Sequence, residues 1–225
     1  YQKPNATVVY NDFDGYRYRL EHIPQTNELL TRLRGVVSVP RHKPIQGKER
    51  EQVLTLIREH ECLYGYVDYI TLSSSLLFSM KYATSYEELE KDTLYNNIKA
   101  TNYPLCSDYF DGLTITSCDY NEVFNSYKDT PNVVFLVDPP YLSTDSSTYK
   151  MYWKLSDYLD VLTILAGHHF IYFTSNKSSI VELCEWVGKN KLIGNPFQNC
   201  HRREFNAHMN YNSSYTDIML YTNAI

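Results

Sequence analysis

The sequence predicts an α/β fold with a mostly parallel sheet, an antiparallel C-terminal strand and helices on both faces. Short apolar runs alternate with segments of helical spacing over the second half of the chain. Two predicted strands run directly into an acid, Asp12 and Asp138, at the strand end where open α/β sheets hold their ligands. Residues 35–113 are mostly helical in pattern, which indicates an insertion between strands.

The individual elements follow from apolar periodicity and from residues that favour helix ends. Pro24 predicts a fault in the helix after the first strand, since proline lacks an N–H. Residues 85–88 (Ser-Tyr-Glu-Glu) resemble a capping box, and Ser178 is a candidate helix cap. The expected strands span residues 8–10, 113–117, 133–137, 169–174, 191–193 and 217–222, and the expected helices span 16–34, 48–60, 69–81, 87–99, 121–128, 156–165 and 178–189.

Composition places the chain among ordinary soluble proteins. Its 225 residues suffice for one α/β domain with an insertion, and 43% of them are hydrophobic. We find no signal peptide and no apolar run long enough to span a membrane, so we expect a cytoplasmic protein without a membrane partner. The five cysteines are scattered without a CxxC spacing, which predicts free thiols and no metal site.

The net charge of −5 does not favour a nucleic-acid binder, but the distribution of charge does. Between residues 32 and 50, six basic residues stand against one acidic residue, and a second small basic group spans 201–203. The alternative is a solvated face without a ligand. The candidates for contacts with phosphates are Arg41, Lys43, Lys48, Arg202 and Arg203.

The tetrapeptide Asp138-Pro139-Pro140-Tyr141 follows an apolar strand and is the strongest candidate for a catalytic site. The prolines lack backbone donors and have a fixed φ, so their carbonyls are held in one geometry. An aromatic exocyclic amine is a poor nucleophile, because its lone pair is delocalised into the ring. The Asp138 carboxylate and the Pro139 carbonyl can accept its two N–H bonds and favour a pyramidal, nucleophilic nitrogen, while Tyr141 stacks on the ring. The simpler interpretation is a Pro-Pro turn with a packed tyrosine.

Two further segments fit the same pattern. Residues 7–14 (Thr-Val-Val-Tyr-Asn-Asp-Phe-Asp) form a predicted strand that ends in an acid, and Ser117-Cys118-Asp119-Tyr120 ends another. With the tetrapeptide, they resemble the DNA adenine methyltransferases of the Dam-like group, in which DPPY ends the fourth strand and the motifs follow the alpha-group order. The resemblance covers residues 6–34 and 114–223 approximately.

This resemblance implies a Rossmann-like methyltransferase domain, formed by residues 1–34 and 114–225. The helical insertion, residues 35–113, would then recognise the DNA target. The reaction implied is the transfer of a methyl group to the 6-amino group of adenine in double-stranded DNA, after the base is flipped out. The loop 142–154 would close over that base, with Tyr149 as a further DNA contact.

The resemblance also implies S-adenosylmethionine as cofactor. Asp12 would bind its ribose hydroxyls, and Asp119 would accept a hydrogen bond from its adenine amino group. Phe13 and Tyr120 beside them complete the expected cofactor site. Asp14 is the second candidate for the ribose. The alternative for all three acids is helix capping, which aspartate favours whatever the function.

Several alternatives stay open at this point. Related tetrapeptides also serve enzymes that methylate an amino group in RNA or the side chain of glutamine. A different class is a catalytically inactive DNA-binding fragment, because the Phe-x-Gly-Gly-like loop of the family's first strand is absent from these residues. We therefore expect upstream residues in the gene product, and weak or no cofactor binding without them. We expect a monomer, with a cognate restriction endonuclease as an optional partner.

Overall fold

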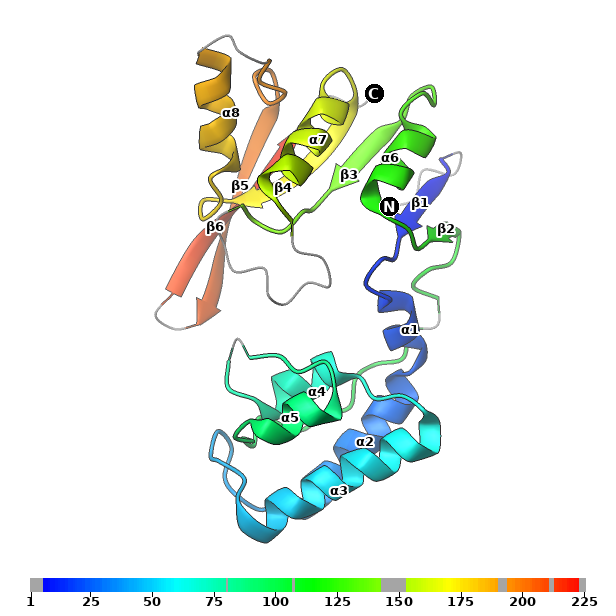
Figure 1. Cartoon of the computed structure of the whole chain (residues 1–225), viewed down its shortest axis with the longest axis vertical. Coiled ribbons are helices and arrows are strands. Elements are labelled where there is room, and N and C mark those ends of the chain that lie inside the picture. The colour runs from blue at the N-terminus through cyan, green and yellow to red at the C-terminus, as the bar shows by residue number, and fades with distance from the viewer. Residues whose placement is uncertain are drawn as a thin grey trace. The chain divides into compact units, whose positions relative to one another are not determined.

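The computed structural model describes residues 6–79, 81–106, 108–142, 153–189, 194–210 and 213–222. The chain divides into two compact units, Tyr1–Thr116 and Ser117–Ile225, which are described separately (Figure 1). Within the described ranges, no helix combines the length and the apolar character that a membrane crossing requires.

The first unit joins a small parallel sheet to a set of helices. The Asp12 N–H donates to the Thr116 carbonyl at 2.7 Å, which extends the pairing to the point where both strands end. The strands are β1 (Val8–Asn11) and β2 (Leu113–Thr116), and the helices are α1 (Tyr16–Glu21), α2 (Ile23–Val36), α3 (Gly47–Tyr64), α4 (Tyr69–Leu76) and α5 (Tyr86–Lys91).

The break between α1 and α2 lies at His22, slightly before the predicted fault at Pro24. Pro24 occupies the first turn of α2, where its missing N–H would have no partner within the helix. The proline therefore starts a helix here instead of interrupting one.

Helices α4 and α5 end earlier than predicted because a later segment bonds to other parts of the unit. The Tyr95 N–H donates to the Leu76 carbonyl at 2.7 Å, and the Ile45 N–H donates to the Leu94 carbonyl at 2.7 Å. These pairings hold the chain after α5 in an extended form, where the sequence predicts helix to residue 99.

The predicted cap of α5 is present, with one difference. The Ser85 hydroxyl accepts the Glu88 N–H at 3.3 Å, as in a capping box. The Glu88 carboxylate, however, accepts the N–H of Thr84 at 2.7 Å and not that of Ser85.

The core of the first unit forms between α2, α3 and the segments that follow them. Leu29, Leu30 and Leu33 of α2 pack there with Val53 and Ile57 of α3, all nearly inaccessible to solvent. The predicted boundary between residues 34 and 35 therefore falls inside a helix that belongs to this core. The role of the 35–113 segment in target recognition stays a prediction.

In its described residues, the second unit is a four-stranded sheet with three helices. Strands β3 and β4 are parallel, as predicted, whereas β6 is antiparallel to both of its neighbours, β4 and β5. The strands are β3 (Val134–Val137), β4 (His169–Ser175), β5 (His201–Asn210) and β6 (Ser213–Tyr221), in the order β3-β4-β6-β5, and the helices are α6 (Tyr120–Tyr127), α7 (Leu155–Leu165) and α8 (Ile180–Lys189).

The described helices of this unit cover one face of its sheet, where the sequence predicts helices on both (Figure 1). Phe135 and Val137 of β3 and Tyr172 of β4 are buried in one cluster with Val161 of α7 and Cys184 of α8. Leu136, on the opposite face of β3, is 69% exposed. The alternation along β3 thus produces one packed face and one open face in the described part of this unit.

Strand β5 is the largest departure from the predicted elements. The sequence predicts no strand at residues 201–210, where His201, Arg202 and Arg203 suggest a basic surface segment. In the structure these residues pair with β6 along the edge of the sheet, where exposed charges are common and discourage pairing with other chains. The strand expected at 191–193 lies outside the described residues.

Candidate active site

The turn after β3 contains two proline carbonyls, of which one is hydrogen-bonded within the described residues and the other is not. Asp138 is exposed, and Pro139 and Pro140 are buried. The hydroxyl of Tyr158, a buried residue of α7, donates to the Pro140 carbonyl at 2.8 Å. Among the described residues, no hydrogen bond reaches the Pro139 carbonyl. Of the two carbonyls, that of Pro139 is therefore the candidate acceptor for a ligand.

Tyr141 is hydrogen-bonded to β6, the second strand from β3 in the sheet. Its hydroxyl donates to Oδ1 of Asp217 on β6 at 3.0 Å. The strand register explains why Asp217 lies close to Tyr141. Asp217 pairs with Ser175, the last residue of β4, at the carboxyl end of the parallel strands. Burial raises the pKa of Tyr141 above its usual range, and the bond to Asp217 raises it further.

Asp138 lies near a second carboxyl group. The surrounding protein displaces part of the water around the Asp138 carboxyl, although the residue is exposed, and this raises its pKa. The negative charge of Asp217 raises the pKa of Asp138 further. Two carboxyl groups thus act on the environment of the predicted catalytic turn.

Asp12, in the first unit, is a buried carboxylate with its oxygens engaged by backbone donors. Oδ1 accepts the N–H of Tyr16 at 2.6 Å and Oδ2 accepts the N–H of Arg17 at 2.9 Å. These contacts satisfy the first backbone donors of α1, which is the helix-capping role that the sequence analysis gives as the alternative for Asp12. They use one lone pair on each oxygen, and the Tyr10 hydroxyl also interacts with this carboxylate, so a ribose hydroxyl could use only the lone pairs that remain.

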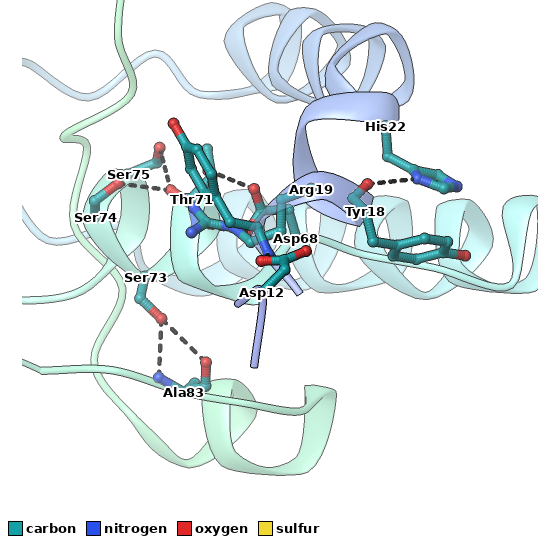
Figure 2. Close-up of polar contacts among 11 residues, drawn as sticks. Asp12, Tyr18, Arg19, His22, Asp68, Thr71, Ser73, Ser74, Ser75 and Ala83 are labelled. Atoms are coloured by element: carbon teal, nitrogen blue, oxygen red, sulfur yellow. Dashed lines mark hydrogen bonds and ion pairs between the residues drawn. The ribbon is translucent and has the colours of Figure 1, made fainter. Parts of the chain in front are cut away.

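Helix α1, which Asp12 caps, is anchored to the helical part of its own unit. Nε of Arg19 lies 3.2 Å from Oδ1 of Asp68, which in turn accepts the N–H of Thr71 at 3.0 Å (Figure 2). Phe13, directly after Asp12, is 38% exposed and is available to a ligand.

Asp119 and Tyr120, in the second unit, begin α6. Oδ1 of Asp119 accepts the Asn121 N–H at 2.8 Å, so this acid also caps a helix. The Tyr120 ring stacks on Trp153 with a centroid distance of 4.6 Å, and its hydroxyl donates to Asp157 at 3.0 Å. Burial, together with the Asp157 bond, raises the pKa of Tyr120 to about 12. Tyr120 is thus a fixed aromatic surface beside the acid.

The six basic residues between positions 32 and 50 separate into two groups. Arg32 is paired with Glu59 at 2.7 Å, and Nε of Arg34 donates to the Leu30 carbonyl at 3.1 Å. In the described ranges, the other group makes no side-chain ion pair or hydrogen bond, and it is exposed. That group consists of the three predicted phosphate contacts, Arg41, Lys43 and Lys48.

The other predicted DNA contacts lie in the second unit. Arg202 forms an ion pair with Glu204 on the same strand at 2.7 Å, and the guanidinium of Arg203 lies 5.9 Å from the centre of the Tyr221 ring. Arg202 is therefore less available to a phosphate than the three unpaired residues of the first unit. Tyr149 lies outside the described residues.

Tyr158 and Asp217 are site residues that the sequence analysis did not single out. Tyr158 is one of 22 tyrosines and has no local signal. For Asp217 the sequence offers only a weak sign of a functional role, because it is a charged residue at the start of the apolar strand predicted at 217–222.

The comparisons with known proteins are consistent with a transferase. The chain is 32% identical over 226 residues to a protein of Haemophilus influenzae (strain ATCC 51907 / DSM 11121 / KW20 / Rd) named "Putative methyltransferase". The match covers 97% of this chain and 74% of that protein. No protein-family profile matches the chain, and no solved structure matches it.

Proposed function

This chain belongs to the methyltransferase family of that relative, and from this premise we propose that it methylates the 6-amino group of adenine in DNA, with S-adenosylmethionine as the donor. The observation that supports the proposal is the turn after β3. There the Asp138 carboxyl is exposed and the Pro139 carbonyl has no partner among the described residues. Tyr141 stands next to them with its hydroxyl bonded to Asp217.

These groups suit an aromatic amine in two ways. The Asp138 carboxylate and the Pro139 carbonyl each accept one N–H, which directs the nitrogen lone pair away from the ring and toward the methyl donor. The Tyr141 ring stacks on the base and fixes its plane. A bond forms between nitrogen and the methyl carbon as the bond between sulfur and that carbon breaks. Sulfur retains the electron pair, and the nitrogen then releases a proton to solvent.

We assign cofactor binding to Asp12 and Phe13 after β1, and to Asp119 and Tyr120 at the start of α6. The chemistry of these groups fits a nucleoside: carboxylates accept hydroxyl and amino protons, and aromatic rings lie against a purine. The capping bonds to Asp12 and Asp119 hold both carboxylates in fixed directions. S-adenosylmethionine, when bound, supplies the methyl group on a positively charged sulfur.

The contact with DNA is assigned first to Arg41, Lys43 and Lys48. Their exposure and their lack of described ion pairs leave them available to phosphates. Beside them, a hollow with a volume of about 410 Å³ is lined by His42, Tyr95 and other polar and aromatic residues of the same unit. The flipping of adenine out of the duplex would make its 6-amino group accessible to the turn.

Methyl transfer with a labelled donor tests this proposal. The protein is incubated with S-adenosylmethionine labelled in the methyl group and with one of two duplexes, which differ only in that the second carries N6-methyladenine in place of every adenine. We expect label in the first duplex and none in the second. Parallel incubations contain RNA or a glutamine-containing peptide in place of the duplex, and label there with none in DNA would overturn the choice of substrate. Calorimetric titration without detectable binding of S-adenosylmethionine would favour an inactive DNA-binding protein.

A further inference from the structure

The turn that carries the catalytic candidates is fixed by two side chains from elsewhere in the second unit. Tyr158 of α7 reaches the Pro140 carbonyl, and Asp217 of β6 reaches the Tyr141 hydroxyl. The two contacts span 18 and 76 positions of sequence, so they depend on the packing of α7 and β6 against β3 and β4.

The Tyr158 hydrogen bond is buried and reaches only one of the two proline carbonyls among the described residues. Tyr158 is only 3% exposed and packs in the core beside Val161 and Phe135. Its hydroxyl bonds to the Pro140 carbonyl and so links the second proline to α7. The first carbonyl, of Pro139, remains without a described partner. The hydroxyl of Tyr158 therefore restrains the Pro140 carbonyl and, with it, the rotation of the turn.

The Asp217 contact combines geometry with charge. Its carboxylate accepts the Tyr141 hydroxyl and so restrains the rotation of that ring. The same carboxylate is the charged group that acts on Asp138. Among the residues that the structure describes, the other titratable groups that interact with Asp138 are Tyr141 in the turn and Tyr172 of β4, both of which have a raised pKa and are uncharged at neutral pH.

We propose that Tyr158 and Asp217 are positioning residues for methyl transfer: Tyr158 orients the proline carbonyls, and Asp217 orients the Tyr141 ring and sets the charge around Asp138. The inference rests on the proposed function. Neither residue touches the substrate, and each acts through a residue of the turn.

The first test is Tyr158→Phe, which removes one hydroxyl and keeps the ring in the core. The buried Pro140 carbonyl then lacks its partner, and the turn can rotate. We expect kcat to fall by about tenfold to a hundredfold, the cost of a small misplacement of reacting groups. KM for S-adenosylmethionine should stay within roughly twofold, since no proposed cofactor contact is changed. Tyr127→Phe is the matched control, because Tyr127 packs on the same core without a described hydrogen bond of its side chain.

Two variants of Asp217 separate orientation from charge. Asp217→Asn keeps an acceptor for the Tyr141 hydroxyl and removes the charge. We expect the acidic limb of its pH–kcat profile to move to lower pH, because the pKa of Asp138 falls when the neighbouring charge is removed. Asp217→Ala also removes the acceptor, and its kcat should fall by about tenfold or more. Tyr158→Phe should leave the position of the acidic limb unchanged.

The outcomes distinguish this inference from the proposed function. Wild-type transfer to adenine DNA, with kcat of Tyr158→Phe and Asp217→Ala within about twofold of wild type, would overturn the positioning roles alone. If kcat, the affinity for S-adenosylmethionine and the melting temperature all fell together in these variants, the effect would be purely structural. That result would also overturn the positioning roles. Absence of wild-type transfer would overturn the proposed function. In that case, NMR of the Asp138 carboxyl group tests the inference by measuring the pKa of Asp138. A pKa of Asp138 that is the same in Asp217→Asn as in the wild type would refute it.

Discussion

Replacement of Asp138 by asparagine should separate stability from activity. The Asp138 carboxyl is partly stripped of water and feels the negative charge of Asp217, so its pKa is raised. Its ionised form is therefore less favourable in the folded than in the unfolded protein, and asparagine removes this cost while it preserves the shape. Because Asp138 is exposed, screening limits the gain in the free energy of unfolding to between a few tenths and about 1 kcal/mol. For a chain of this size, 1 kcal/mol corresponds to roughly 2–4 °C in Tm.

The sign of the effect depends on pH in a defined way. A carboxyl group with a raised folded pKa costs stability above that pKa and nothing below its unfolded pKa of about 4. Asp138→Asn should therefore exceed the wild type in Tm at pH 7, and the difference should disappear as the pH falls below about 4.

The same substitution should nearly abolish methyl transfer. Loss of one preorganised electrostatic contact in an active site lowers kcat by about 10²–10³-fold. Thermal denaturation gives the stability, calorimetry gives the affinity for S-adenosylmethionine, and labelled transfer gives kcat. Glu185→Gln, which removes an exposed carboxylate on α8, is the control for charge alone. A loss of stability at pH 7, or a fall in cofactor affinity as large as the fall in kcat, would refute the reasoning.

Three further predictions concern the first unit. Arg41→Ala and Lys43→Ala should each weaken DNA binding and reduce the slope of log K against log salt by about 1, measured by fluorescence anisotropy, with Lys128→Ala as control; an unchanged slope would exclude the phosphate contact. Burial lowers the pKa of His60, whose Nδ1 has no partner in the described part of the chain, so the wild type should lose stability as the pH falls below about 6.5. His60→Phe should remove this dependence in denaturant titrations at pH 5 and 7, and a persistent dependence would assign it elsewhere. Leu33→Ala should cost about 2–5 kcal/mol in the same titrations, because Leu33 is fully buried in the core of α2 and α3; a cost below about 1 kcal/mol would contradict that packing.

Local signals predicted the elements whose ends depend on neighbouring residues. The strand before Asp138, the Ser85 cap and the start of α6 at Asp119 all follow from residues within a few positions. The helix predicted at 87–99 was wrong in length because the backbone donors of Tyr95 to Asn97 find acceptors far along the chain, and the Leu94 carbonyl accepts from Ile45. Helix periodicity carries no information about such partners.

Strand β5 shows the same limit for the sheet. Its polar sequence has no apolar alternation, and it is a strand because β6 offers a complementary edge. The single helix-covered face of the second unit likewise depends on which helices pack there, and a pattern of alternating strands and helices predicts both faces.

The sequence by itself determined which chemical groups stand at the end of β3, because an apolar run followed by Asp138-Pro139-Pro140-Tyr141 is a local property. Only the tertiary structure decided how these groups are used. The Pro140 carbonyl accepts the Tyr158 hydroxyl, the Pro139 carbonyl has no hydrogen bond among the described residues, and the Tyr141 hydroxyl donates to Asp217. The physical reason is that a hydrogen bond requires two groups to meet in space, and these partners come from a helix and a strand that only folding brings to the turn.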